Sequence, residues 1–317
     1  MNQGWIYRDQ VGPADAGLSL LEYYAERYRH SSRRDWRARI EAGQILVDRQ
    51  RVTPETLLQA GQQLTYARPP WEEPVVPLDF EVLHEDKDLL VVAKPSGLPV
   101  LPGGGFLEHT LLRQLQRCYP SETPVPIHRL GRGTSGLMLL ARSHLARSHL
   151  SHQMRQSTAQ AESPTDSTAA PGKLYLALIA PCDLPDCFTL TTPIGKVAHP
   201  VLGHVYAATP TGKPAYSTVR VLQRREESTL LEVAIRTGRP HQIRIHLAAA
   251  GYPLLGDPLY APGGVPQVLA PDADGKLPVP GDCGYWLHAF RLRFIHPRHQ
   301  EVMEFECSPP DALSLQR

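Results

Sequence analysis

The sequence has little that would place this protein in a membrane or in an oxidising compartment. The N-terminal stretch MNQGWIYRDQVGPADAG contains no apolar core of signal-peptide length, and no later apolar run is long enough to span a bilayer. Only five cysteines, an odd number, occur in 317 residues, which argues against a disulfide framework. We therefore expect a soluble, cytoplasmic protein.

The sequence also lacks a set of metal ligands and a strong net charge. Cys182 and Cys187 have no second Cys/His pair at a spacing typical of zinc fingers, so no metal site is expected. A formal net charge of +1 means that binding to nucleic acid must be judged from local clusters of basic residues. With 42% hydrophobic residues, the chain can bury a sizeable core, and we expect one large domain and one small one.

Residues 18–68 are expected to form the small domain, after an N-terminal extension of residues 1–17. The stretch LSLLEYYAERY has a helical period, and Ser31 or Ser32 can cap a second helix, RRDWRARIEAG, which ends at Gly43. The stretch QILVDRQRV then predicts a β-hairpin, and LLQAGQQLTYA predicts a turn and a closing strand. The proline-rich residues 69–77 predict an extended linker to a second domain, residues 78–317.

The second predicted helix lies in a cluster of arginines. Six arginines and a single acid, Asp35, occur between Arg27 and Arg39. Arg33 and Arg37 lie one helical turn apart, so their side chains can contact successive phosphates of a nucleic acid, although a solvated surface is the commoner explanation. The candidate RNA-binding residues of this domain are Arg33, Arg34, Arg37 and Arg39.

The central stretch of the second domain is PIHRLGRGTSGLMLLAR, residues 126–142. It places His128, Arg129 and Arg132 in a glycine-rich turn directly before an apolar strand. Glycines let a backbone approach a ligand closely, and a buried strand fixes the turn, so this arrangement suits the floor of an anion-binding cleft. A tight hairpin with solvated arginines explains the turn alone equally well.

A second group of basic residues lies further along the chain. The stretch LLEVAIR predicts a strand, and HQIRIHLAAAG predicts a helix that begins near His241 and ends at Gly251. Arg239, His241 and Arg244 crowd the first turn of this helix, where the helix dipole is unfavourable for cations. An anionic partner, either an RNA phosphate or a buried carboxylate, explains their position better than helix stability does.

The remaining stretches predict strands, short helices and two surface loops. Leu89 to Ala93 is an expected strand before the turn KPSG, Thr110 to Tyr119 and Ser143 to Arg155 are expected helices, and Lys173 to Ile179 is an expected central strand. Residues 156–172 are poor in hydrophobic side chains, and residues 262–284 are rich in proline and glycine. We expect both segments to be exposed loops.

Several of these stretches together carry a resemblance to a known family. HRL-x-x-TSG, K-x-Y-x-A in residues 173–177, TGR-x-HQIR-x-H and G-x-P-x-x-GD-x-x-Y resemble the motifs of RluA-type RNA pseudouridine synthases. The resemblance runs from about Glu81 to Phe305. The order of helices and hairpin in residues 18–68 resembles the alpha-L RNA-binding module, which is named after a small-subunit ribosomal protein and occurs in many such enzymes.

The resemblance implies a fold, a reaction and a set of site residues. The implied fold is α+β, with a mixed, largely antiparallel sheet. The implied reaction converts uridine to pseudouridine in structured RNA, such as rRNA or tRNA, without a cofactor or metal, and we expect a monomer. Tyr175 and Arg244 would be the catalytic residues. Tyr175 would stack on the target base and can also act as the base that takes the C5 proton, and Arg244 would be the active-site arginine. The implied RNA contacts of this domain are His128, Arg129, Arg132, Thr134, Arg239 and His241.

One position departs from the family motif. The family usually carries its catalytic aspartate where this chain has Gly131, so Arg244 would lack its usual partner. Either solvent or an RNA phosphate fills the space, or a carboxylate arrives from elsewhere, with Asp257 expected to be structural. Two hypotheses follow: an RNA pseudouridine synthase with altered catalysis, or a catalytically silent RNA-binding protein that acts in ribosome assembly or RNA folding.

Overall fold

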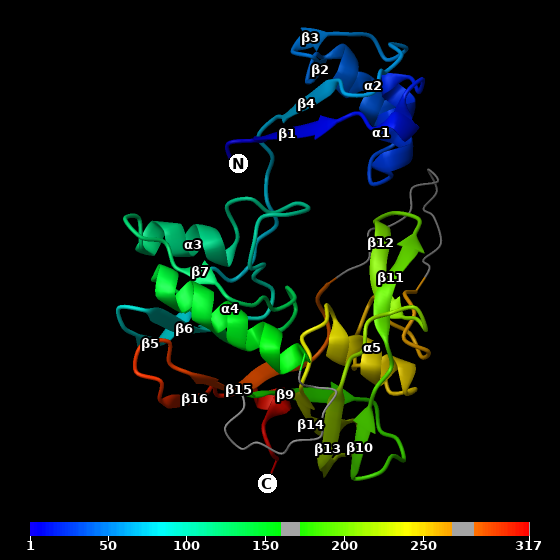
Figure 1. The fold of residues 1–317 in the computed structure, drawn as a ribbon. Coiled ribbons are helices and arrows are strands. Elements are labelled where there is room, and N and C mark those ends of the chain that lie inside the picture. The colour runs from blue at the N-terminus through cyan, green and yellow to red at the C-terminus, as the bar shows by residue number, and fades with distance from the viewer. Residues whose placement is uncertain (160–171, 268–281, 317) are drawn as a thin grey trace. The chain divides into compact units, whose positions relative to one another are not determined.

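The computed structural model describes residues 1–159, 172–267 and 282–316 (Figure 1). The chain divides into two compact units. The first consists of residues 1–73 and 197–205, and the second consists of the described residues of 74–196, 206–267 and 281–317. Among the described residues, no helix has both the length and the apolar character needed to cross a bilayer.

The first unit combines two helices with a small antiparallel sheet. Its elements are β1 (Trp5–Gln10), the 3-10 helix η1 (Pro13–Asp15), α1 (Leu20–Arg27), α2 (Arg33–Glu41), β2 (Ile45–Val47), β3 (Gln50–Arg51) and β4 (Gln63–Arg68). The sheet order is β1-β4-β2-β3. Ser32 caps α2 through a capping box with Asp35, which confirms the start of this helix. Strand β1 pairs with β4, so part of the expected N-terminal extension belongs to the same sheet as the module.

A continuous core holds the first unit together. Trp36 of α2 is buried against Tyr24 of α1 and Tyr66 of β4, with ring centroids 4.9 and 5.6 Å away. Burying such large rings is the main favourable contribution to the stability of a domain of this size. The guanidinium of Arg39 lies over the Trp36 ring at 4.4 Å, so this arginine contributes to packing as well as to surface charge.

The second unit is built on one large sheet. Its strands are β5 (Glu81–Glu85), β6 (Leu89–Lys94), β7 (Val125–Pro126), β8 (Ser135–Ala141), β9 (Gly172–Ile179), β10 (Cys187–Leu190), β13 (Ser217–Arg224), β14 (Thr229–Ile235), β15 (Leu287–Ile295) and β16 (Val302–Glu306). The order is β10-β13-β14-β9-β15-β8-β6-β5, with β16 paired to β15 and β7 paired to β8. All of these pairings are antiparallel except β15 with β8. The α+β, largely antiparallel fold is therefore confirmed.

The remaining elements are helices and a separate hairpin. They are α3 (Leu111–Cys118), α4 (His144–Ala159), β11 (Ile194–His199), β12 (Gly203–Ala208), α5 (Gln242–Ala249) and the 3-10 helix η3 (Asp311–Leu313). Residues 197–205 of the hairpin, which consists of β11 and β12, are grouped with the first unit. Thr110 caps α3 through its side chain, and α4 packs on β8 and β15. Most of the two expected loops lies outside the described residues, since only 156–159, 172, 262–267 and 282–284 are described. Of these, residues 156–159 belong to α4 and residue 172 to β9, so the ends of the first expected loop are not loop.

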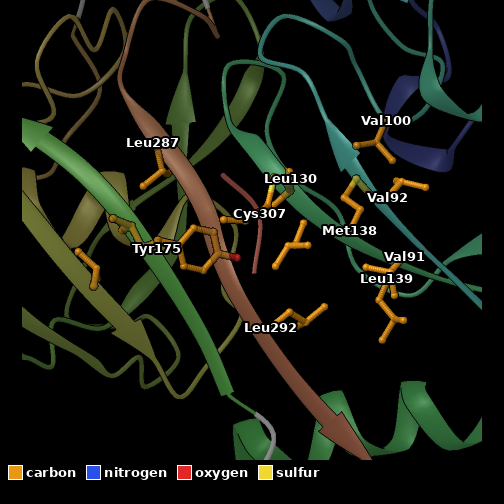
Figure 2. Close-up of a cluster of buried hydrophobic side chains, with 14 of the residues drawn as sticks. Val91, Val92, Val100, Leu130, Met138, Leu139, Tyr175, Leu287, Leu292 and Cys307 are labelled. Atoms are coloured by element: carbon orange, nitrogen blue, oxygen red, sulfur yellow. The ribbon is translucent and has the colours of Figure 1, made fainter. Parts of the chain in front are cut away.

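The core of the second unit lies at the centre of the large sheet. Every residue of β8 is buried, in a strand that has β6 paired along one edge and α4 packed against it. Figure 2 shows side chains of β6 and β8 (Val91, Val92, Met138 and Leu139) in the same buried cluster as Tyr175 of β9 and Leu287 of β15. This cluster gives a rigid base to the turn that precedes β8.

Candidate active site

The glycine-rich turn before β8 lies beside the segment that precedes β15. The one parallel pairing of the sheet sets His288 opposite Ser135 and Ala289 opposite Gly136. A Cβ atom on Gly136, whose φ is +103°, would lie 2.3 Å from the carbonyl oxygen of Ala289, so only glycine fits at this point. The amide of Gly133 donates a hydrogen bond to the carbonyl oxygen of Asp282 at 2.8 Å. Residues 131–136 and 282–289 therefore form one structural unit.

The KPSG turn after β6 fixes the glycine-rich turn from another direction. The buried ammonium of Lys94 donates to the carbonyl oxygen of Arg132 at 3.2 Å and to two carbonyls of its own turn at 2.8 Å. Ser96 Oγ donates to the carbonyl of Gly133 at 2.7 Å, and the amide of Gly97 donates to that of Arg132 at 2.8 Å. These contacts fix the KPSG turn and the glycine-rich turn to each other.

The burial of Lys94 predicts a pH dependence of stability. Burial lowers the pKa of Lys94 to about 7, although nearby Asp282 and Cys283 act in the opposite direction. The unfolded chain then holds this proton from about pH 7 up to the usual lysine pKa, while the folded chain does not. Because of Lys94, the free energy of unfolding must therefore rise with pH in that window, by up to about 1.4 kcal/mol per pH unit.

We expect the difference in unfolding free energy between the wild type and Lys94→Met to grow in favour of the wild type between pH 7 and pH 9. Urea denaturation at several pH values measures this difference. The Met variant cannot titrate at this position, so it gives the pH dependence of all the other groups. A difference that stays constant over the window would mean that the three carbonyls keep the ammonium charged.

Arg244 is the buried cation at the centre of the site. Its side chain is 2% exposed, and its Nε and Nη2 donate to the two carboxylate oxygens of Asp257 at 2.7 and 2.8 Å. Its Nη1 donates to Oδ1 of Asp282. The guanidinium also lies over the ring of Tyr285, 4.2 Å from the centroid. Arg244 therefore has two carboxylate partners, Asp257 and Asp282, and neither comes from position 131.

The two carboxylates beside Arg244 have different surroundings. The Asp257 side chain is 1% exposed, and its Oδ1 also accepts the amides of Leu259 and Tyr260 at 2.9 and 3.1 Å. The Asp282 side chain is 35% exposed, and its Oδ2 accepts the amide of Arg132 at 3.1 Å. Asp257 is thus enclosed by protein, whereas Asp282 is open to a molecule that enters the site.

A model of the RNA pseudouridylate synthase family matches residues 88–249, half of the chain. The similarity extends over nearly the whole length in an RNA pseudouridine synthase of Synechocystis sp. that is described as uncharacterized, with 51% identity over 93% of this chain and 95% of that one. The chain belongs to the RNA pseudouridine synthase family.

Other proteins that this chain resembles also carry pseudouridine synthase names. RNA pseudouridine synthase 5 of Arabidopsis thaliana is 42% identical over 92% of this chain and 89% of its own length. The ribosomal large subunit pseudouridine synthase D of Nitrosomonas europaea is 32% identical over 94% and 83%. The solved structure of human RNA pseudouridylate synthase domain containing 1 shares the fold, with a TM-score of 0.54 and 23% identity over 77% of this chain and 89% of that one.

Tyr175 lies in the buried cluster beneath the turn of this synthase. It sits on β9, is 8% exposed, and belongs to the same cluster as Leu130 and Leu287 (Figure 2). Tyr285 is a member of this cluster as well. Burial raises the pKa of Tyr175, so its phenol carries its proton at neutral pH. Tyr175 is therefore a protonated phenol in mostly apolar surroundings.

Two histidines of the predicted site make internal contacts. His128 Nε2 accepts the amide of Leu139 at 3.1 Å, and burial holds the pKa of His128 well below its usual value. His241 precedes α5 with a φ of +55°, and its Nδ1 lies 2.9 Å from the hydroxyl of Tyr260. Burial and the neighbouring Arg244 lower the pKa of His241 to about 4. His241 is therefore neutral near pH 7, and the first turn of α5 carries fewer charges than the sequence suggests.

The other predicted contacts of the second unit differ in exposure. Arg129 is exposed, and Arg132 is half-buried with its guanidinium 5.1 Å from the ring centroid of Phe106. Arg239 Nε donates to the carbonyl oxygen of Pro214, in the loop before β13, at 3.0 Å. Thr134 is buried, with Oγ1 3.3 Å from the hydroxyl of Tyr285. Arg129 and Arg132 are thus basic side chains of the turn itself, while Thr134 contacts Tyr285.

Among the described residues, one cluster outside this site resembles a set of metal ligands. Single ligand atoms of Asp86, Asp88 and His296 lie within 4.8 Å of one another. Asp88 already accepts two hydrogen bonds from the guanidinium of Arg298, at 2.5 and 2.9 Å, and one from Ser143 at 2.6 Å. These contacts explain the cluster as an ion-pair network that joins β6 to the end of β15.

Proposed function

We propose that this protein isomerises uridine to pseudouridine in structured RNA, either rRNA or tRNA. The observation that carries the proposal is the pairing of buried Arg244 with a solvent-accessible carboxylate at the glycine-rich turn. A buried guanidinium that holds an accessible carboxylate beside a basic surface is a suitable arrangement for attack on, or deprotonation of, a bound nucleotide.

The proposed reaction needs the uridine to leave its stack. The N-glycosidic bond breaks, the base turns, and the base rejoins the ribose through C5, which requires access to both faces of the nucleotide. We assign Tyr175 to an aromatic contact with the base, and Arg129, Arg132 and Arg239 to the flanking phosphates. The neutral histidines His128 and His241, and the buried Thr134, would act by shaping this surface.

The RNA class is proposed from two sources of support. The relative from Nitrosomonas europaea is named for the large ribosomal subunit. The first unit also carries Arg33 and Arg34 exposed on α2, on the module that resembles an alpha-L RNA-binding domain. A basic helix of this kind binds the phosphate backbone of a structured RNA without reading its sequence.

The test is to map pseudouridine in total RNA from the host of this protein and from a strain in which its gene is deleted. One or more sites should disappear in the deletion strain, and the purified protein should restore them in RNA extracted from that strain. If every site persists in the deletion strain and the protein still binds the RNA, the alternative of a catalytically silent RNA-binding protein is supported. This alternative is motivated by Gly131, which has no side chain and so supplies no catalytic group at that position.

The arginines of α2 allow a matched test of RNA binding. Replacing Arg33 and Arg34 together by Ala should weaken binding to RNA and lower the slope of log K against log salt concentration by about 1 to 2, because two phosphate contacts are lost. Arg220→Ala is the control, since this exposed arginine belongs to the second unit and its guanidinium is already paired with Glu232 at 2.8 Å. Filter binding at several salt concentrations measures both variants, and equal losses would place the RNA on another surface.

A further inference from the structure

The space in front of Gly131 is occupied by groups from another part of the chain. A Cβ atom built on Gly131 would lie 2.8 Å from the hydroxyl of Tyr285, 3.6 Å from Oγ1 of Thr134 and 3.7 Å from Oδ2 of Asp282. A short acidic side chain at position 131 would therefore meet the Tyr285 hydroxyl first and would begin 3.7 Å from the Asp282 carboxylate. Asp282 brings a carboxylate to the place where the glycine provides none.

The carboxylate of Asp282 is held at both oxygens. Oδ1 accepts from the guanidinium of Arg244, and Oδ2 accepts from the amide of Arg132, the residue after Gly131. The main chain at the same residue is fixed as well, because its carbonyl oxygen accepts the amide of Gly133. A side chain with this many contacts has a defined position, as a group that meets a reacting atom requires.

Neutralising Arg244 does not require Asp282. Asp257 already forms a two-point ion pair with the guanidinium, is fully enclosed, and lies on the short segment that follows α5. A second carboxylate beside one arginine adds repulsion between like charges. Its presence therefore needs an explanation other than charge neutralisation. Asp282 is also the one of the two that solvent, and hence a substrate, can reach.

We propose that the Asp282 carboxylate is the catalytic carboxylate of this protein, supplied by the segment before β15 in place of a side chain at position 131. This inference rests on the proposed function, since it names the group that performs the isomerisation.

The role of Asp282 can be written as a balanced sequence. An oxygen of the carboxylate attacks C1′ of the uridine, a C1′–O bond forms, and the N1–C1′ bond breaks with its electron pair on N1 of the uracil. After the base has turned, C5 attacks C1′ and the carboxylate leaves with the electron pair of the C1′–O bond. The proton on C5 is lost to solvent and N1 takes up one proton, so the product is an isomer of the substrate and Asp282 is regenerated.

The test compares Asp282→Asn with the wild type on RNA from the deletion strain. The amide keeps the size of the side chain and an oxygen that can accept hydrogen bonds, but it is a poor nucleophile. We expect the single-turnover rate of pseudouridine formation to fall by about 10³-fold or more, with RNA affinity close to that of the wild type. The matched control is Asp186→Asn, which removes an exposed carboxylate paired with Arg224 on the surface and should leave the rate unchanged.

The outcomes separate this inference from the proposed function. An active wild type with an inactive, folded and RNA-binding Asn variant supports the role of Asp282. Equal activity of the wild type and the Asn variant overturns the role of Asp282 and leaves the proposed function in place. An inactive wild type contradicts the proposed function, and with it the role of Asp282.

A second variant covers the case in which the Asn protein does not fold. Asp282→Glu retains the charge beside Arg244 but moves the carboxylate by one methylene. We expect a folded protein whose rate is at least about tenfold below that of the wild type, because a displacement near 1 Å spoils the line of attack on C1′. A Glu variant as fast as the wild type would overturn the assignment.

Discussion

Asp257→Ala is expected to lower the unfolding free energy of the second unit by about 3–5 kcal/mol, the usual cost of removing one partner of a buried ion pair. Arg244 is 2% exposed and would lose the acceptors of its Nε and Nη2. The amides of Leu259 and Tyr260 would lose their common acceptor as well. Each unpaired buried donor adds to the loss.

Asp282→Ala is the matched control for this effect, because it removes the other carboxylate that contacts the same arginine. Its side chain is one third exposed, so the interaction is screened by solvent and its loss should cost no more than about 1 kcal/mol. Urea denaturation, followed by a probe in the second unit, measures both variants. If the two substitutions destabilise the protein equally, Asp282 is a structural partner of Arg244 in the same sense as Asp257.

The local part of the structure could be predicted from the sequence. The start of α2 at the Ser32 cap is set by neighbouring residues, and the alternation of Lys173 to Ile179 is sufficient to indicate the strand that became β9. The buried run of β8 was recognisable for the same reason, since a near-continuous apolar stretch after a glycine-rich turn suits a central strand. These signals lie within a few residues of one another.

The carboxylate of the site could not be predicted, because its position depends on contacts between distant parts of the chain. Asp282 bonds to Arg132 across 150 positions, and the sequence offered residues 262–284 only as an exposed loop. The approach of the two segments depends on the single parallel pairing of the sheet, in which β15 lies beside β8. The register between distant strands is set by the packing of the whole sheet, so a local sequence pattern does not predict it. Tyr285 was missed for the same reason.

Gly131→Asp should have opposite effects in two backgrounds. In the wild type, the new side chain would meet the Tyr285 hydroxyl, and its carboxylate would crowd that of Asp282. Repulsion between two carboxylates at one arginine, together with the displaced tyrosine, should lower both stability and the rate of pseudouridine formation. In a protein that carries Asp282→Ala, the same substitution returns one carboxylate to the site and should raise the rate.

The size of this reversal follows from the proximity of the two positions. Residues in contact have coupling energies of about 0.5–3 kcal/mol, and about 1.4 kcal/mol corresponds to a tenfold change in rate. We therefore expect Gly131→Asp to raise the rate of Asp282→Ala by about tenfold, most clearly when Tyr285→Phe removes the hydroxyl that lies 2.8 Å from the new Cβ. The four combinations at positions 131 and 282, assayed on the same RNA in both Tyr285 backgrounds, form a double-mutant cycle. If Gly131→Asp slows the reaction by the same factor in every background, positions 131 and 282 do not act at the same point of the active site. If the rate recovers only in the Asp282→Ala background, a carboxylate can enter this site from either segment.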